Sequence, residues 1–188
     1  MSDSEKERLQ ALDAYFAAEP TPQLQAHVRQ EISKHDPTSA LGAVSGIQDR
    51  GLLQDLLDAG IQPATFAALA LLPLCEVAWA DGAISSRERE AILTAATQHG
   101  IESGSPARAL LEHWLATQPE LKMMTAWKEY IAALVSRLPQ DRAVQLAEEI
   151  LGRARSIAKT SGGILGMGAK VSVSEQFALD ELEHAFRP

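Results

Sequence analysis

The chain has a single cysteine and fewer basic than acidic residues, and each shortage excludes a class of protein. Cys75 cannot form a disulfide within the chain, and it lies in the most apolar stretch, where a thiol is typically a small core residue. The 17 Lys and Arg residues against 25 Asp and Glu residues give a formal net charge of −8. Because sequence-independent binding to nucleic acid or anionic membrane needs a basic surface, we expect no nucleic-acid partner and favour a basic protein partner.

The chain also lacks a long apolar run and a signal peptide. Its longest apolar stretch, 66–80, is shorter than the about 20 residues that cross a bilayer, and Pro73 and Glu76 interrupt it. We therefore expect a buried helix there and no membrane span. The first residues, MSDSEKER, do not have the basic start and apolar centre of a signal peptide, which predicts a cytoplasmic protein.

Apolar residues recur with helical spacing along nearly the whole chain, and no run alternates with the period of a strand. A central helix is expected to begin near Pro63 and to be kinked or restarted at Pro73, because proline lacks a backbone N–H. The pattern predicts an all-α fold, a compact bundle of roughly eight to ten helices joined mostly by short turns. Helices before the central one are expected at 9–16, 24–32, 39–47 and 51–59.

Five further helices are predicted after the central one, and their apolar stripes define the expected core. The tryptophans fall on such stripes, which favours core positions over a ligand cage for Trp79, Trp114 and Trp127. The last helix begins at a serine cap. Its predicted buried side consists of Phe177, Leu182 and Phe186.

The most specific motif lies where the central helix meets the next one. Residues 74–85, LCEVAWADGAIS, place an alanine-rich helix before Ala-Asp-Gly-x-Ile, and Glu88 follows in the next helix. This pattern resembles the signature of the TerB (tellurite-resistance) family. The resemblance covers 60–188 and implies a compact helical domain with two weakly related halves. Residues 1–59 would then be an N-terminal helical extension packed on the main domain.

The resemblance further implies a link to bacterial stress response, no established catalysis, and an acidic cluster that binds a divalent cation such as Ca, Mg, Mn or Zn. On this basis Asp81 and Glu88 are the candidate metal ligands, with Glu76 and Glu90 as additional candidates. The motif echoes later in the chain, at 171–175. Aligning that echo on Glu88 places Gly168 where Asp81 stands, so the second half lacks the acidic residue.

Both Ser-x-x-Glu motifs also fit capping boxes at helix starts. In this arrangement Ser85 and Ser172 accept a bond from the third helical amide, and Glu88 and Glu175 return one to the cap. The capping role accounts for both glutamates without a metal.

Asp81 is harder to explain by capping alone. Gly82 is expected to adopt the left-handed conformation that ends a helix, which would put Asp81 at the negative end of the helix dipole. A positive charge should compensate. It could come from Arg87 or Arg89, or from a divalent ion shared with Glu88.

Other binding motifs fail on their residue types. An EF-hand loop would require oxygen ligands at Val77 and Trp79. The glycine-rich stretch 162–170 resembles a phosphate loop, but Ala169 separates the last glycine from Lys170 and no strand precedes it. We expect a surface loop there, which could also serve in docking.

These observations support three hypotheses. The preferred one is a non-catalytic TerB-like binding module in a stress response, responsive to a divalent metal, with no catalytic or cofactor-binding residues. The alternative is a purely structural protein–protein interaction domain without metal, and self-association is open in both. A metal-dependent hydrolase is the least favoured, because neither the five histidines nor the acids have metalloenzyme spacing.

Overall fold

The computed structural model describes residues 36–161 and 171–187. The helices expected at 9–16 and 24–32, the glycine-rich stretch 162–170 and the alignment of Gly168 lie outside the described residues. The helices, contacts and exposed fractions given for the chain belong to this described part.

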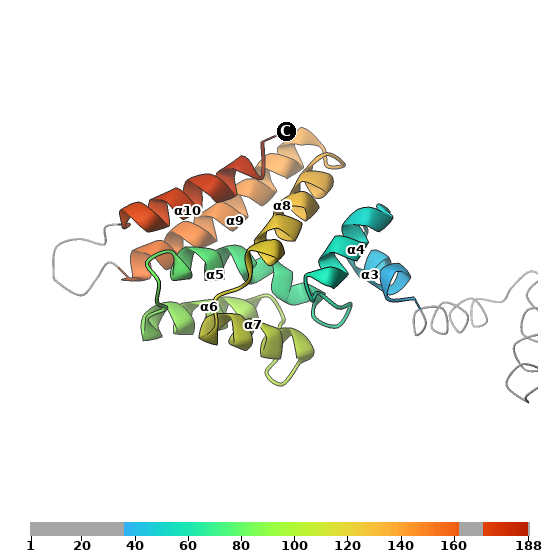
Figure 1. Cartoon of the computed structure of the whole chain (residues 1–188). Coiled ribbons are helices and arrows are strands. Elements are labelled where there is room, and N and C mark those ends of the chain that lie inside the picture. The colour runs from blue at the N-terminus through green and yellow to red at the C-terminus, as the bar shows by residue number, and fades with distance from the viewer. Residues whose placement is uncertain (1–35, 162–170, 188) are drawn as a thin grey trace, which may run out of the picture.

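Every regular element in this part is helical (Figure 1), so the prediction of an all-α bundle is confirmed. No helix of this part combines the length and apolar composition needed to cross a bilayer. Eight α-helices and one 3-10 helix follow one another as α3 (Pro37–Ser45), α4 (Arg50–Asp58), η1 (Phe66–Leu71), α5 (Leu72–Trp79), α6 (Ser86–Gln98), α7 (Pro106–Ala116), α8 (Leu121–Val135), α9 (Gln140–Ser161) and α10 (Val173–His184).

Short polar side chains begin five of these helices. The side chain of the residue before each first turn accepts a backbone N–H of that turn, which satisfies an amide that has no partner within the helix. Each such cap contributes about 0.5–2 kcal/mol. The five caps are Asp36, Asp49, Ser85, Ser105 and Ser172.

The central apolar stretch is divided in two, as the position of Pro73 predicts. The 3-10 helix η1 ends at Leu71, and α5 starts with Pro73 in its first turn, where a missing N–H costs nothing. Helix α5 is almost entirely buried. Burial raises the pKa of the Cys75 thiol, and the neighbouring Glu76 carboxylate raises it further, so the thiol stays protonated in the core.

Helix α5 is buried because other helices surround it. It packs against α9, α10, α6 and α7, and α9 also packs against α6 and α10. In Figure 1, α9 and α10 lie side by side on one side of α5, and α6 and α7 lie on the other. Helices α3 and α4 pack on each other, and α4 also packs against α8.

One hydrophobic core extends through all of these helices. Leu41 on α3 and Leu56 on α4 are fully buried in the same cluster as Leu182 on α10. The described part of 1–59 therefore shares its core with 60–188. The boundary itself stays a prediction.

The prediction for the buried side of α10 was wrong at Phe177, whose side chain is 66% exposed. Leu182 is buried, and Phe186 is half-buried with its ring 6.0 Å from that of Trp127 in an edge-on arrangement. Leu182 follows Phe177 by five positions, which corresponds to about 140° of helical rotation beyond one turn, so the two cannot share a face. The core side of α10 consists of Glu175, Ala178, Leu179 and Leu182.

Candidate functional site

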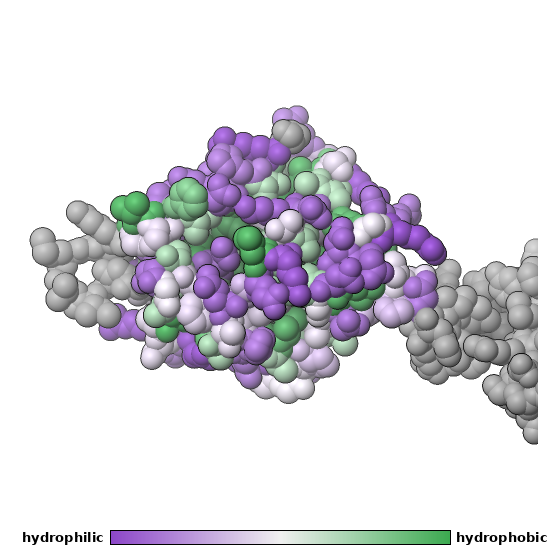
Figure 2. Space-filling view, in the orientation of Figure 1, coloured by the Kyte–Doolittle hydropathy of each residue, from purple (hydrophilic) through white to green (hydrophobic). Residues whose placement is uncertain are grey.

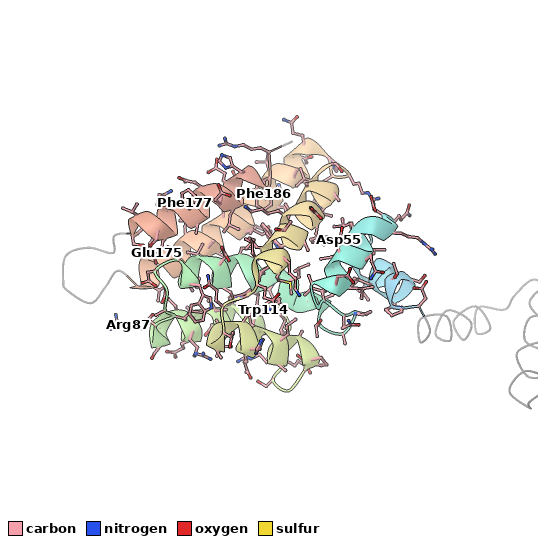
Figure 3. The ribbon with its side chains drawn as sticks, in the orientation of Figure 1. Asp55, Arg87, Trp114, Glu175, Phe177 and Phe186 are labelled. Carbon is pink, nitrogen blue, oxygen red and sulfur yellow. The ribbon has the colours of Figure 1, made fainter. Side chains whose placement is uncertain are left out.

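The first turns of α6 and α10 lie at the same end of the bundle (Figure 1). Helix α9 packs against both, and the charge of Glu175 acts on Glu88. Figure 3 shows Glu175 at the same end of the molecule as Arg87, which lies in the first turn of α6. The fold thus brings together two Ser-x-x-Glu motifs that are far apart in the sequence. We call Asp81, Glu88 and Glu175 the acidic corner.

Both capping boxes are present at this corner. At the start of α6, Ser85 N–H donates to Glu88 Oε2 over 2.8 Å, and Glu88 N–H donates to Ser85 Oγ over 3.3 Å. At the start of α10, the corresponding distances between Ser172 and Glu175 are 2.6 Å and 3.2 Å. Each glutamate is therefore held on the helix that it caps.

The two glutamates are the buried charged residues of the described chain, with 2% of Glu88 and 3% of Glu175 exposed. Burial raises the pKa of Glu88, and the charges of Asp81 and Glu175 raise it further. The hydrogen bonds from Ser85 act in the opposite direction and lower it. Two of the three carboxyl groups of the corner therefore lie where water reaches poorly, whereas Asp81 is exposed.

Asp81 directly follows Ala80, the C-cap of α5, at the helix end where the dipole is negative. Helix α5 ends at Trp79, and Gly82, with φ of 93°, turns the chain while its N–H donates to Trp79 O over 2.8 Å. Asp81 is exposed, and its Oδ1 accepts the N–H of Ala83 over 3.2 Å. Within the described ranges no ion pair joins it to an arginine. Its turn hydrogen bond and hydration lessen the need for a compensating charge.

Of the two arginines considered for Asp81, Arg89 binds another helix. Arg89 Nη2 donates to Leu115 O over 2.5 Å, and Trp79 Nε1 donates to Trp114 O over 2.8 Å. Both carbonyls belong to the last turn of α7, whose acceptors have no partner within the helix. The two donors hold this helix end against α5 and α6. The sequence indicates that an indole N–H needs an acceptor, but not which one.

The two additional metal-ligand candidates lie apart from each other. Glu76 is half-buried on α5, where it is under the influence of Lys128 on α8. Glu90 is exposed on α6 and lines a shallow hollow with Arg89 and Arg108. The described residues contain no group of three or more His, Cys, Asp or Glu placed to hold a metal ion. A metal at Asp81 and Glu88 stays a prediction.

Comparisons with family models, curated proteins and solved structures found no match to the chain. The resemblance to TerB therefore depends on residues 74–85 and Glu88 alone.

The raised pKa of Glu88 gives a pH-dependent expectation for Glu88→Gln. A carboxyl whose pKa is higher in the folded state stabilises the fold at low pH, and that contribution is lost as pH rises through its folded pKa. Glutamine cannot titrate, yet its side-chain oxygen can still accept Ser85 N–H. We expect the stability of the variant relative to the wild type to increase between about pH 4 and pH 8, measured by urea unfolding.

Glu181→Gln is the matched control, because the expected slope has the opposite sign. The hydrogen bond and charge of Lys128 lower the pKa of Glu181, so its contribution is present at high pH and is lost as pH falls. Relative stability of this variant should therefore decrease as pH rises. Equal slopes for the two variants would contradict the assigned effect of burial on Glu88.

Proposed function

We propose that the chain is a non-catalytic, TerB-like binding module of a bacterial-type stress response, of the tellurite-resistance kind, that acts in the cytoplasm. The observation that carries the proposal is the acidic corner, where two helix starts with the same Ser-x-x-Glu pattern each bury a glutamate. Two related halves, as the TerB resemblance implies, would produce such a pair. The motif at 74–85 supports the same assignment.

A divalent ion would bind at this corner through Asp81, whose carboxylate is exposed, and Glu88, whose charge interacts with it. Carboxylate oxygens suit Mg²⁺, Ca²⁺ and Mn²⁺, whereas a structural Zn²⁺ site needs four ligands that are usually Cys or His. Two protein carboxylates fit an ion that keeps several waters. When bound, the ion would supply the positive charge that ties the α5–α6 turn to the start of α6.

Titration with Ca²⁺, Mg²⁺, Mn²⁺ and Zn²⁺ by calorimetry and thermal unfolding tests this proposal. A metal present at ten times its Kd stabilises the fold by about 1.4 kcal/mol, which raises the Tm by roughly 3–6 °C for a chain of this size. We expect saturable heat and this shift in the wild type, and neither in Asp81→Ala. Asp55→Ala is the control, because Asp55 is exposed on α4, away from the corner (Figure 3).

A second candidate function is a protein-interaction domain that uses no metal. It is favoured by the capping boxes, because Oε2 of both glutamates already accepts a backbone N–H. The absence of saturable heat with all four ions, with an unchanged Tm, would leave this function in place of the first. The net charge of −8 then favours a partner that carries positive charge.

A further inference from the structure

Large apolar side chains are exposed on two neighbouring helices, α8 and α10. The exposed fractions are 83% for Leu121, 90% for Val173 and 66% for Phe177. Val173 and Phe177 are four residues apart and lie on the face of α10 opposite its buried side. Figure 2 shows hydrophobic surface over the first half of α10 and near the start of α8. Three of the five large apolar side chains that are exposed in the described residues thus lie on these two helices.

An ion pair joins the two helices that carry these side chains. Lys128 Nζ of α8 lies 2.9 Å from Glu181 Oε2 of α10. Leu121 precedes Lys128 by seven residues, and Phe177 precedes Glu181 by four, so each lies on the same side of its helix as its member of the pair. Figure 3 shows Phe177 on the first half of α10. We call Leu121, Lys128, Val173, Phe177 and Glu181, together with Glu76, the α8–α10 surface.

The charged part of this surface has one negative charge in excess. Glu76 extends from α5, which packs against α10, and is close enough to Lys128 for its charge to act on the carboxyl. Lys128 donates its hydrogen bond to Glu181, and no side chain of the described residues donates one to Glu76. A half-buried carboxylate without a donor favours a further cation beside it.

We propose that the α8–α10 surface docks an amphipathic helix of a partner protein, with apolar side chains against Leu121 and Phe177 and a lysine or arginine beside Glu76. The inference rests on the proposed function of a binding module and names its partner. An amphipathic helix presents apolar anchors one or two turns apart with charged residues beside them, which suits a surface where exposed apolar side chains accompany an acidic residue. A second copy fits less well, because it also carries a charge of −8 and would bring its own acidic residues to the contact.

Fluorescence anisotropy with the full chain and a set of labelled helical peptides tests the proposal. Each peptide carries two leucines spaced by three, four or seven residues and one lysine, and its counterparts carry glutamate or norleucine instead of lysine. We expect the wild type to bind one lysine peptide most tightly. Phe177→Ser and Leu121→Ser should each weaken binding by at least about fivefold, as for anchors of an interface. Glu76→Gln should weaken the lysine peptide and leave the norleucine peptide unchanged.

Val44→Ser and Val144→Ser are matched controls, since both valines are about half exposed but lie on α3 and α9. Affinity that is equal for the lysine and glutamate peptides, or that Phe177→Ser leaves unchanged, would overturn the proposal. A wild-type dimer in sedimentation that Phe177→Ser dissociates would assign the surface to a second copy instead. Failure of every peptide, with the metal response at Asp81 intact, would remove this inference and leave the proposed function standing.

Discussion

Leu56→Ala is expected to destabilise the chain by about 2–5 kcal/mol, the usual cost of truncating a fully buried leucine. Leu56 is 0% exposed on α4, in the N-terminal part of the chain, but it belongs to the core that also contains Leu182. Helix α4 packs directly against α8. The loss of stability should therefore also affect helices that are far away in the sequence.

Urea unfolding followed by tryptophan fluorescence measures this effect directly. All three tryptophans lie within 60–188, so their signal reports on that part alone. We expect Leu56→Ala to lower the midpoint of the fluorescence transition together with that of far-UV circular dichroism. Leu57→Ala is the control, because Leu57 is only partly buried and should cost less. An unchanged fluorescence midpoint beside an earlier loss of helix would show that 1–59 unfolds separately.

Features that depend on near neighbours in the sequence could be predicted well. A serine that caps a helix and the glutamate three residues later interact within one turn, so Ser85 with Glu88 and Ser172 with Glu175 are readable as pairs. The restart of the helix at Pro73 is local in the same way, because it follows from one missing N–H.

Features that depend on distant segments could not be predicted. Two apolar stripes of α10 are compatible with helical spacing, one through Phe177 and one through Ala178 and Leu182. The positions of α5 and α9 decide which stripe is buried. The stripe through Ala178 and Leu182 is the buried one. The bond between Trp79 and the carbonyl of Trp114 likewise required the path of α7.

The candidate site contains both kinds of feature, those that depend on near neighbours in the sequence and those that depend on distant segments. The identity of Asp81 and Glu88 comes from one short motif, whereas the proximity of Glu88 to Glu175 depends on α9 packing against both α6 and α10. The sequence also placed Asp81 at the end of a helix. In the structure α5 ends at Trp79 with Ala80 as its C-cap, and Asp81 and the left-handed Gly82 form the turn that directly follows.

Trp127→Ala is expected to have the largest effect of any substitution on α8, a loss of about 3–5 kcal/mol in the free energy of unfolding. Trp127 is 1% exposed, and its ring meets Phe186 edge-on just after the end of α10. Such an aromatic pair contributes about 0.5–1.5 kcal/mol beyond the area that it buries. Guanidinium unfolding followed by far-UV circular dichroism measures the loss without depending on the removed indole.

Two controls separate the loss of packing from any general sensitivity of α8. Trp127→Phe keeps an aromatic ring against Phe186 and should lose less. Leu121→Ala lies on the same helix but is 83% exposed, and it should change stability by no more than about 0.5 kcal/mol. If Leu121→Ala proved as destabilising as Trp127→Ala, Leu121 would be a core residue and could not belong to a docking surface. Stability measurements on α8 therefore test the α8–α10 surface before any peptide is added.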